Sequence, residues 1–217
     1  GFGPLEIAGY SGTVLYYLTL LWTKSESFST MVILFTLVLI MCVYVFYYPR
    51  YRAEQIMAAL FGMVYVAVML SYIYKTRNLE GGAWLVGLIF LSSGGIETVA
   101  DCGWRRMGRG KMAPDLKKSV EGGIGGVAGA ALLGALYALA IAGLNPAEGH
   151  TPLMYALICA VGALISMVGD LAASAIKRNK EIKDYGTLIP GHGGILDRFD
   201  SVIFTAPFIY FLASVLI

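Results

Sequence analysis

The feature that most constrains this chain is a series of seven apolar runs, each about as long as a bilayer is thick. A helix needs about 20 largely apolar residues to cross the hydrocarbon core. The runs cover residues 5–22, 28–48, 54–74, 82–100, 120–143, 152–175 and 201–217. They are too long and uniform for barrel strands, and a lipid-facing backbone must satisfy its own hydrogen bonds. We therefore expect an all-α polytopic integral membrane protein with about seven transmembrane helices.

The composition agrees with a membrane protein and excludes several soluble classes. Hydrophobic residues make up 58% of the chain and charged residues 14%, which is far from the balance of a globular domain. Cys42, Cys102 and Cys159 are widely spaced and form no CxxC pair, so neither a disulfide framework nor a zinc site is indicated. The sequence begins with Gly1 rather than Met, which is compatible with a missing native N terminus.

The basic residues are distributed unevenly between the two sides of the membrane. If the runs alternate in direction, 13 of the 16 basic residues lie on one side. Only Lys24, Lys75 and Arg77 lie opposite. The positive-inside rule makes the basic side cytoplasmic, and we expect the site to face the cytoplasm from the inner (plasma) membrane. We also expect residues 1–100 to be a scaffold with possible lipid access, and residues 101–217 to be catalytic, with polar loops at 101–119 and 176–199.

Carboxylates and basic residues gather around the last two apolar runs. Asp170, Ser174 and Lys177 are spaced at i, i+4 and i+7, which stacks them on one face of a helix. An ionised Asp in a membrane helix costs roughly 2.5 to 3.5 kcal/mol at the bilayer centre, so a purely decorative role is disfavoured. Asp197 and Asp200 are one helical turn apart.

These three carboxylates predict a site for a hard cation. Oxygen ligands suit Mg²⁺, which keeps coordination positions open for substrate phosphates. A zinc site would need His and Cys, and only His192 is near. The glycine-rich loop around His192 precedes a helix start, where the backbone can approach an anion closely. Lys117, Lys118 and Ser119 likewise precede a helix and could contact a phosphate.

The segment from Ser174 to Asp200 resembles the C-terminal hallmark of the phosphatidate cytidylyltransferase (CDP-diacylglycerol synthase) family. The matching residues are Ser174, Lys177, Arg178, Lys183, Asp184, Pro190, His192, Gly193, Gly194, Asp197, Arg198 and Asp200. A second family element, paired lysines and Ser or Thr followed by Glu-Gly, is matched by residues 117–122. The resemblance covers about residues 97–200. Between 97 and 118 the chain departs from the family pattern: Glu97 and Thr98 stand where the family usually has Asp-Thr.

The resemblance implies transfer of a cytidylyl group from CTP to phosphatidate, with Mg²⁺ as cofactor and room for a second cation. It implies catalytic roles for Asp170, Asp197 and Lys177, and metal binding by Asp170, Asp197 and Asp200. The implied substrate-binding residues are Lys117, Lys118, Ser119, Ser174, Arg178, Lys183, His192 and Arg198. The partners would be CTP, phosphatidate and membrane lipid, without nucleic acid.

Several alternatives remain open at this point. A CTP-dependent polyprenol kinase would use the same nucleotide and metal but transfer the γ-phosphate. A cation transporter would use Asp170 as a ligand within the membrane and predicts further polar groups deep in other runs, of which the sequence has few. The small residues of the run at 120–143 include Gly122 with Gly126 and Gly125 with Gly129, a spacing that lets membrane helices approach closely. They could support a homodimer or pack within one protomer.

Overall fold

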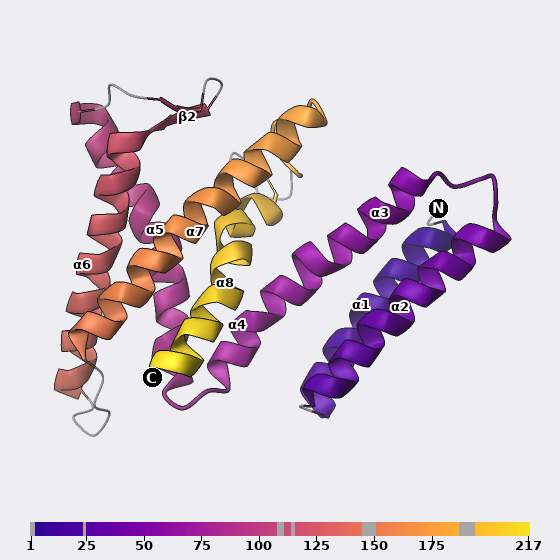
Figure 1. Cartoon of the computed structure of the whole chain (residues 1–217), viewed down its shortest axis with the longest axis horizontal. Helices are drawn as coiled ribbons and strands as arrows, with labels where there is room; N and C mark the ends of the chain where they lie inside the picture. Colours follow the sequence, from indigo (N-terminus) through magenta and orange to yellow (C-terminus); the bar gives the residue numbers. More distant parts are fainter. Residues whose placement is uncertain (1–2, 24, 108–110, 114–115, 145–150, 187–193) are drawn as a thin grey trace. The chain divides into compact units, whose positions relative to one another are not determined.

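The computed structural model describes residues 3–23, 25–107, 111–113, 116–144, 151–186 and 194–217. Between 96 and 121, and at Leu144, only the backbone is described. The described part is almost wholly helical (Figure 1). Its helices are α1 (Pro4–Trp22), α2 (Glu26–Phe46), α3 (Ala53–Gly62), a π-helical segment η1 (Met63–Val68), α4 (Met69–Arg77), α5 (Gly82–Met107), α6 (Val120–Leu144), α7 (Pro152–Asn179) and α8 (Leu196–Leu216).

The seven expected helices are all present in the described residues, because α3, η1 and α4 form one continuous helix from Ala53 to Arg77. Five are long and apolar enough to cross a membrane: Glu26–Phe46, Ala53–Arg77, Gly122–Gly143, Pro152–Asn179 and Leu196–Leu216. A shorter apolar stretch, Gly82–Gly95, forms the first half of α5. α1 is not among these five, and its sequence contains Glu6 and several Tyr, Thr and Gly residues. An all-α polytopic membrane fold is confirmed.

The segment expected to be a polar loop at 101–119 has more regular structure than predicted. The last turns of α5 extend to Met107, and β1 (Lys111–Ala113) pairs antiparallel with β2 (Leu116–Ser119). In this ladder Lys111 lies opposite Ser119 and Ala113 lies opposite Leu116. The other expected loop, 176–199, is shorter than predicted, because α7 continues to Asn179 and α8 begins at Leu196.

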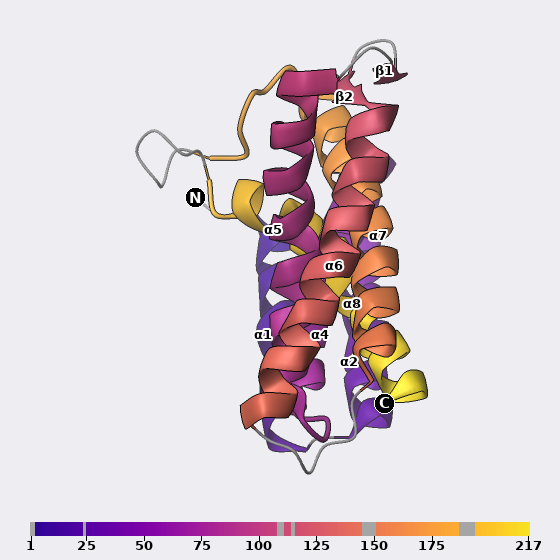
Figure 2. The same cartoon turned by 90° about the vertical axis from the view of Figure 1, so that its left-hand side faces the viewer.

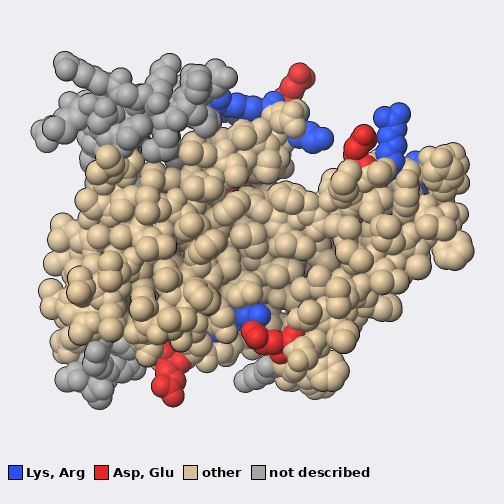
Figure 3. Space-filling model, in the orientation of Figure 1, with Lys and Arg blue, Asp and Glu red and all other residues tan. Residues whose placement is uncertain are grey.

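The chain divides into two compact units, Gly1–Ser71 and Tyr72–Ile217. In the second unit α5, α6, α7 and α8 pack around one core, and Figure 2 shows α5, α6 and α7 side by side. Leu88, Ala138, Ile158 and Ile209 bring one buried side chain from each of these helices. On the face that Figure 3 shows, the described charged side chains in view lie toward the upper and lower edges, and the surface between them is largely uncharged. That pattern is expected of helices solvated by lipid.

The first unit contains α1, α2, α3 and η1. Leu5 and Ala8 of α1 pack with Ile40 of α2 and Ile56 of α3. Farther along, the Tyr16 hydroxyl and the Ser71 hydroxyl share a hydrogen bond of 2.8 Å. The Tyr17 hydroxyl donates to the Ala67 carbonyl at 2.9 Å. Hydrogen bonds of this kind join helices in lipid, where apolar side chains gain little from leaving the bilayer.

Small residues allow close helix contact in the second unit, though only partly where the sequence predicted. Gly122 and Gly126 are buried, but Gly125 is exposed, and a side chain added there would meet nothing within 4 Å. α6 approaches α7 closely at Gly134. A Cβ at this position would lie 2.7 Å from the Tyr155 carbonyl oxygen and 2.8 Å from the Cys159 sulfur. Backbone atoms cannot move aside cheaply, so Gly134 requires glycine.

We therefore expect Gly134→Leu to destabilise the protein by about 1 to 3 kcal/mol, the usual cost of overpacking a core. Thermal unfolding in detergent measures this change. Gly143→Leu is the matched control, because it lies on the same helix and a Cβ there meets nothing within 4 Å. Equal melting temperatures for the two variants would contradict the close approach of α6 and α7 at Gly134.

Candidate active site

The ends of α7 and α8 bring one lysine and two aspartates together. Lys177 lies in the last turn of α7, and Asp197 lies in the first turn of α8. The Lys177 ammonium is 3.0 Å from Asp197 Oδ1 and 3.8 Å from Asp200 Oδ2. The three side chains are 16%, 6% and 7% exposed. Because the cluster is shielded from water, its charges interact more strongly than they would on an open surface.

Asp197 also fixes the backbone of the segment between the two helices. Its Oδ2 accepts hydrogen bonds from the Tyr185 N–H at 2.8 Å and from the Gly194 N–H at 2.9 Å. A Cβ on Gly194 would lie 2.8 Å from the Gly186 nitrogen. The glycine thus lets two backbone stretches meet beside the carboxylate. One side chain therefore pairs with Lys177 and holds both ends of the connecting segment.

Tyr185 forms part of the wall of this cluster. The Lys177 ammonium lies 5.3 Å from the centre of its ring, a distance at which a cation is attracted by the aromatic face. The Tyr185 hydroxyl donates to the Ala173 carbonyl at 3.2 Å. Burial raises the pKa of Tyr185, so its hydroxyl stays protonated and remains a donor at neutral pH. Tyr185 thus holds Lys177 in place and ties the connecting segment back to α7.

Asp200 is buried and has partners on α8 itself. Its Oδ1 accepts from the Ser201 N–H at 2.8 Å and from the Ser201 hydroxyl at 3.2 Å. Its Oδ2 is the oxygen that faces Lys177. The buried carboxylate is therefore both hydrogen-bonded and close to a cation, as a buried charge requires.

The expectation that three carboxylates share one metal ion depends on the position of Asp170. Asp170, Ser174 and Lys177 do lie on one continuous helix, and Asp170 and Ser174 are half-buried. However, the described residues contain no group of three or more His, Cys, Asp or Glu side chains that could hold a metal ion. Asp170 precedes Lys177 by seven residues, about 10 Å along the helix axis, whereas Asp197 and Asp200 lie against Lys177 itself. A metal role for Asp170 stays a prediction.

The remaining candidate residues fall into two groups. Arg178, Lys183 and Arg198 are exposed near the ends of α7 and α8, where a soluble anion could reach them. Ser119 directly precedes α6, as expected of a capping position. The side chains of Lys117, Lys118 and Ser119 lie outside the described residues, and so does the whole of His192.

Sequence reasoning missed three contributors to this cluster. They are Tyr185, the Gly194 N–H as a donor to Asp197, and Ser201 as the partner of Asp200. Gly194 belongs to a glycine-rich loop that the sequence did single out, but as a backbone that could approach an anion rather than as a donor to Asp197. Tyr185 directly follows Lys183 and Asp184, two residues of the family motif. Its place in that motif could have marked it as a candidate site residue.

Comparisons with known proteins point to one family. The pattern of the cytidylyltransferase family matches residues 3–216. The chain is 29% identical to a phosphatidate cytidylyltransferase of Bacillus subtilis (strain 168) over 224 residues, which cover 97% of this chain and 80% of the relative. It is 32% identical to a phosphatidate cytidylyltransferase of Rickettsia bellii over 163 residues, or 73% and 70% of the two chains. A phosphatidate cytidylyltransferase of a Synechocystis species is 43% identical over 101 residues, 46% of this chain and 33% of the relative.

Proposed function

This chain belongs to the cytidylyltransferase family and is a nucleotidyltransferase, and on that premise we propose that it transfers CMP from CTP to phosphatidate. The products would be CDP-diacylglycerol, an intermediate of phospholipid synthesis, and pyrophosphate. The observation that carries the proposal is the shielded cluster of Lys177, Asp197 and Asp200. It lies within the matched part of the chain and combines a cation, which could bind phosphate, with carboxylates, which could bind a metal.

The reaction needs little covalent chemistry from the protein. An oxygen of the lipid phosphate attacks the α-phosphorus of CTP. A new P–O bond forms, and the bond from the α-phosphorus to the α,β-bridging oxygen breaks, so that this oxygen leaves with pyrophosphate. The lipid phosphate is already an anion at neutral pH and needs no general base. Catalysis would then consist mainly of positioning and charge stabilisation, as is usual in phosphoryl chemistry.

The basic residues would bind the triphosphate. Lys177 lies at the centre of the cluster, where Asp197 and the Tyr185 ring hold its ammonium. A preorganised cation of this kind can stabilise negative charge that develops in the transition state. Arg178, Lys183 and Arg198 are exposed near the ends of α7 and α8 and would hold the departing pyrophosphate. The same proposal assigns phosphate contacts to Ser174, His192 and the Lys117–Ser119 segment.

The donor set fits a hard divalent cation. Asp197 Oδ1 and Asp200 Oδ2 both lie within 4 Å of the Lys177 ammonium, so a metal ion held by these two oxygens would take the place of the ammonium, which would turn to the triphosphate. Asp197 and Asp200 would hold Mg²⁺, which prefers such ligands. Asp170 remains a third candidate ligand. When bound, Mg²⁺ would neutralise charge on the triphosphate oxygens.

The membrane setting suits a lipid substrate. Acyl chains can stay in the bilayer while the phosphate reaches the ends of α7 and α8. The excess of basic residues on this side supports a cytoplasmic site on the inner membrane, where CTP and Mg²⁺ are available.

The test is product analysis with purified protein, CTP, phosphatidate and Mg²⁺. We expect CDP-diacylglycerol and pyrophosphate, and at least a hundredfold loss of product when a chelator removes the metal. Restoring Mg²⁺ after chelation should restore the rate. CTP labelled at the α-phosphate should pass its label to the lipid, whereas γ-labelled CTP should not. Transfer of the γ-label would identify a lipid kinase instead, and full activity in chelator would overturn the metal assignment.

A further inference from the structure

Each carboxylate of the cluster turns its two oxygens to different kinds of partner. Asp197 Oδ2 accepts from two backbone N–H groups, and Asp200 Oδ1 accepts from the N–H and the hydroxyl of Ser201. The other two oxygens, Asp197 Oδ1 and Asp200 Oδ2, lie 3.0 and 3.8 Å from the Lys177 ammonium. A metal ion could therefore bind both carboxylates without breaking their other hydrogen bonds only through the oxygens that face Lys177.

A metal ion on these oxygens would come close to the Lys177 ammonium. Mg²⁺ binds a carboxylate oxygen at about 2.0 to 2.1 Å, so an ion on Asp197 Oδ1 would lie no more than about 5 Å from an ammonium that is 3.0 Å from the same oxygen. The cluster is shielded from water, and two positive charges repel each other more strongly there than on an open surface. Lys177 and the metal therefore compete for the same two oxygens.

Lys177 can leave this position more easily than the carboxylates can. Its ammonium is carried by a flexible four-carbon chain, and its side chain is 16% exposed in the last turn of α7. Asp197 is held by two backbone donors, and Asp200 is held by the serine that follows it on α8. A cation that enters the cluster should therefore displace the lysine rather than the aspartates.

A displaced ammonium needs a new anion, because it gives up two carboxylate partners. The triphosphate of CTP is such an anion, and the proposed function brings it to the same ends of α7 and α8. When Lys177 turns to the triphosphate, it keeps an ionic partner and frees the two oxygens for the metal. Nucleotide and metal then each favour binding of the other, and thermodynamic linkage makes the two effects equal in size.

We propose that Lys177 is an internal competitor of the metal, whose ammonium holds Asp197 and Asp200 until the triphosphate takes it. Tight metal binding then depends on the nucleotide. This inference rests on the proposed function, because it takes CTP as the nucleotide and a hard divalent cation as the metal. It adds a role for the lysine that is opposite to that of a metal ligand. Loss of Lys177 should tighten metal binding even though it abolishes the reaction.

The first experiment measures metal affinity without nucleotide or lipid substrate. Mn²⁺ prefers the same oxygen ligands as Mg²⁺. It is titrated into the purified protein in a non-ionic detergent, and free Mn²⁺ is measured by electron paramagnetic resonance. We expect Lys177→Met to bind Mn²⁺ about tenfold more tightly than the unchanged protein, which is within the usual range of coupling between two sites. Lys177→Arg keeps the charge and should not bind more tightly. Equal or weaker binding by Lys177→Met would overturn the proposal.

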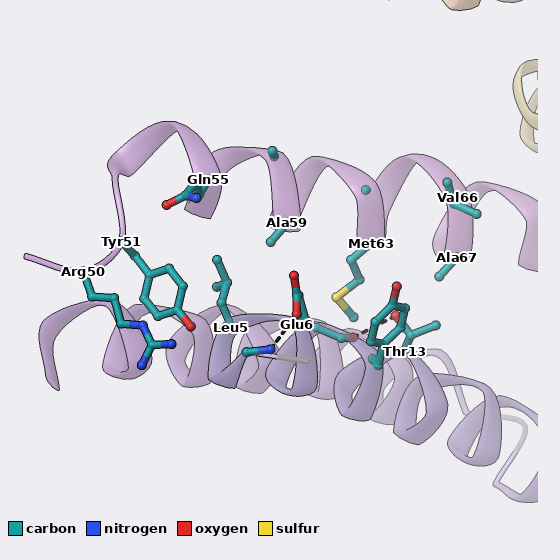
Figure 4. Close-up of a pocket in the computed structure, with 15 residues that line it drawn as sticks. Leu5, Glu6, Thr13, Arg50, Tyr51, Gln55, Ala59, Met63, Val66 and Ala67 are labelled. Atoms are coloured by element: carbon teal, nitrogen blue, oxygen red, sulfur yellow. Dashed lines mark hydrogen bonds between the residues drawn. The ribbon is translucent and has the colours of Figure 1, made fainter. Parts of the chain in front are cut away.

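Two further variants show where the gained binding occurs. Asp200→Asn in the Lys177→Met protein removes one carboxylate and should abolish the gain. Glu6→Gln controls for a carboxylate elsewhere, because Glu6 lines a groove of about 840 Å³ between α1 and α3 in the other compact unit (Figure 4). Glutamine keeps an acceptor for the Gly3 N–H, and the Mn²⁺ affinity should not change. A gain that survives Asp200→Asn, or one that disappears with Glu6→Gln, would contradict competition at the cluster.

The second experiment follows the lysine in the unchanged protein, so it does not depend on the folding of a variant. Reductive methylation, measured by peptide mass spectrometry, modifies lysine amines faster when they are not held in ion pairs. At the Mn²⁺ concentration that saturates the protein, Lys177 should be methylated several times faster than in chelator, because the metal displaces it. Adding CTP should slow the reaction again, because the triphosphate holds the ammonium. Unchanged or slower methylation of Lys177 in Mn²⁺ would overturn the proposal.

Lys180 is the internal control for this measurement. It is exposed just after the end of α7 and should react at the same rate in chelator, in Mn²⁺ and in Mn²⁺ with CTP. Neither experiment contains phosphatidate or requires turnover. Their failure would therefore leave the formation of CDP-diacylglycerol untouched, whereas the absence of that product in the product assay would contradict the proposed function itself.

Discussion

Replacing Lys177 by methionine should reduce product formation by about 100- to 1,000-fold, the usual cost of removing one preorganised charge donor from an active site. Methionine retains much of the length of the lysine side chain but carries no charge. Asp197 and Asp200 would then lose the cation that lies 3.0 and 3.8 Å from their oxygens. The rate of CDP-diacylglycerol formation at saturating CTP measures the effect. The KM for CTP should rise as well if Lys177 holds the triphosphate.

The same substitution should also lower stability, because it leaves two shielded carboxylates without their lysine. Removing one partner of a buried ion pair costs about 3 to 5 kcal/mol, and the 16% exposure of Lys177 argues for less than that here. The melting temperature of the variant in detergent is therefore measured together with its activity. Lys180→Met is the matched control, since Lys180 is exposed just after the end of α7, and its activity should change less than twofold. A folded Lys177→Met protein with more than half of its activity would rule out the proposed role.

The sequence predicted the helices well, because the bilayer leaves the chain few alternatives. The run expected at 152–175 corresponds to α7, and the spacing of Asp170, Ser174 and Lys177 on it follows directly from helix geometry. The ends of the helices were harder to predict. Hydropathy falls where polar residues begin, yet α5 and α7 continue into polar sequence. Helix ends depend on capping and on neighbouring segments, which a hydropathy pattern does not detect.

The sequence named the residues of the candidate cluster but did not predict their contacts. Lys177, Asp197 and Asp200 were all named as functional, and they do lie together. The prediction assigned Lys177 to phosphate and the aspartates to metal, whereas in the structure Lys177 pairs with both aspartates. Spacing along one helix shows which side chains share a face, but contacts between helices depend on their packing.

Asp197→Ala and Asp197→Asn should both abolish activity, for reasons that a second measurement can separate. One carboxylate oxygen accepts from Lys177, and the other accepts from the Tyr185 and Gly194 N–H groups. Asparagine has only one carbonyl oxygen, and its NH₂ group is a donor only. It can therefore satisfy the two backbone donors or the lysine, but not both. Alanine satisfies neither. We expect a loss of about a thousandfold in product formation for each variant.

Amide hydrogen exchange at Tyr185 and Gly194 distinguishes the two roles of this side chain. In Asp197→Ala both amides should exchange faster, because their acceptor is gone. In Asp197→Asn the two amides should remain protected from exchange if the asparagine carbonyl oxygen faces them. Activity should still be lost, because Lys177 has lost its carboxylate partner. Glu181→Gln controls for the removal of a charge in the same connecting segment, since Glu181 is exposed, and should leave both readouts unchanged. Full activity of Asp197→Asn with protected amides would contradict a role for Asp197 in the reaction. Asp197 would then only hold the backbone of the connecting segment. The negative charge of the cluster would have to act through Asp200 alone.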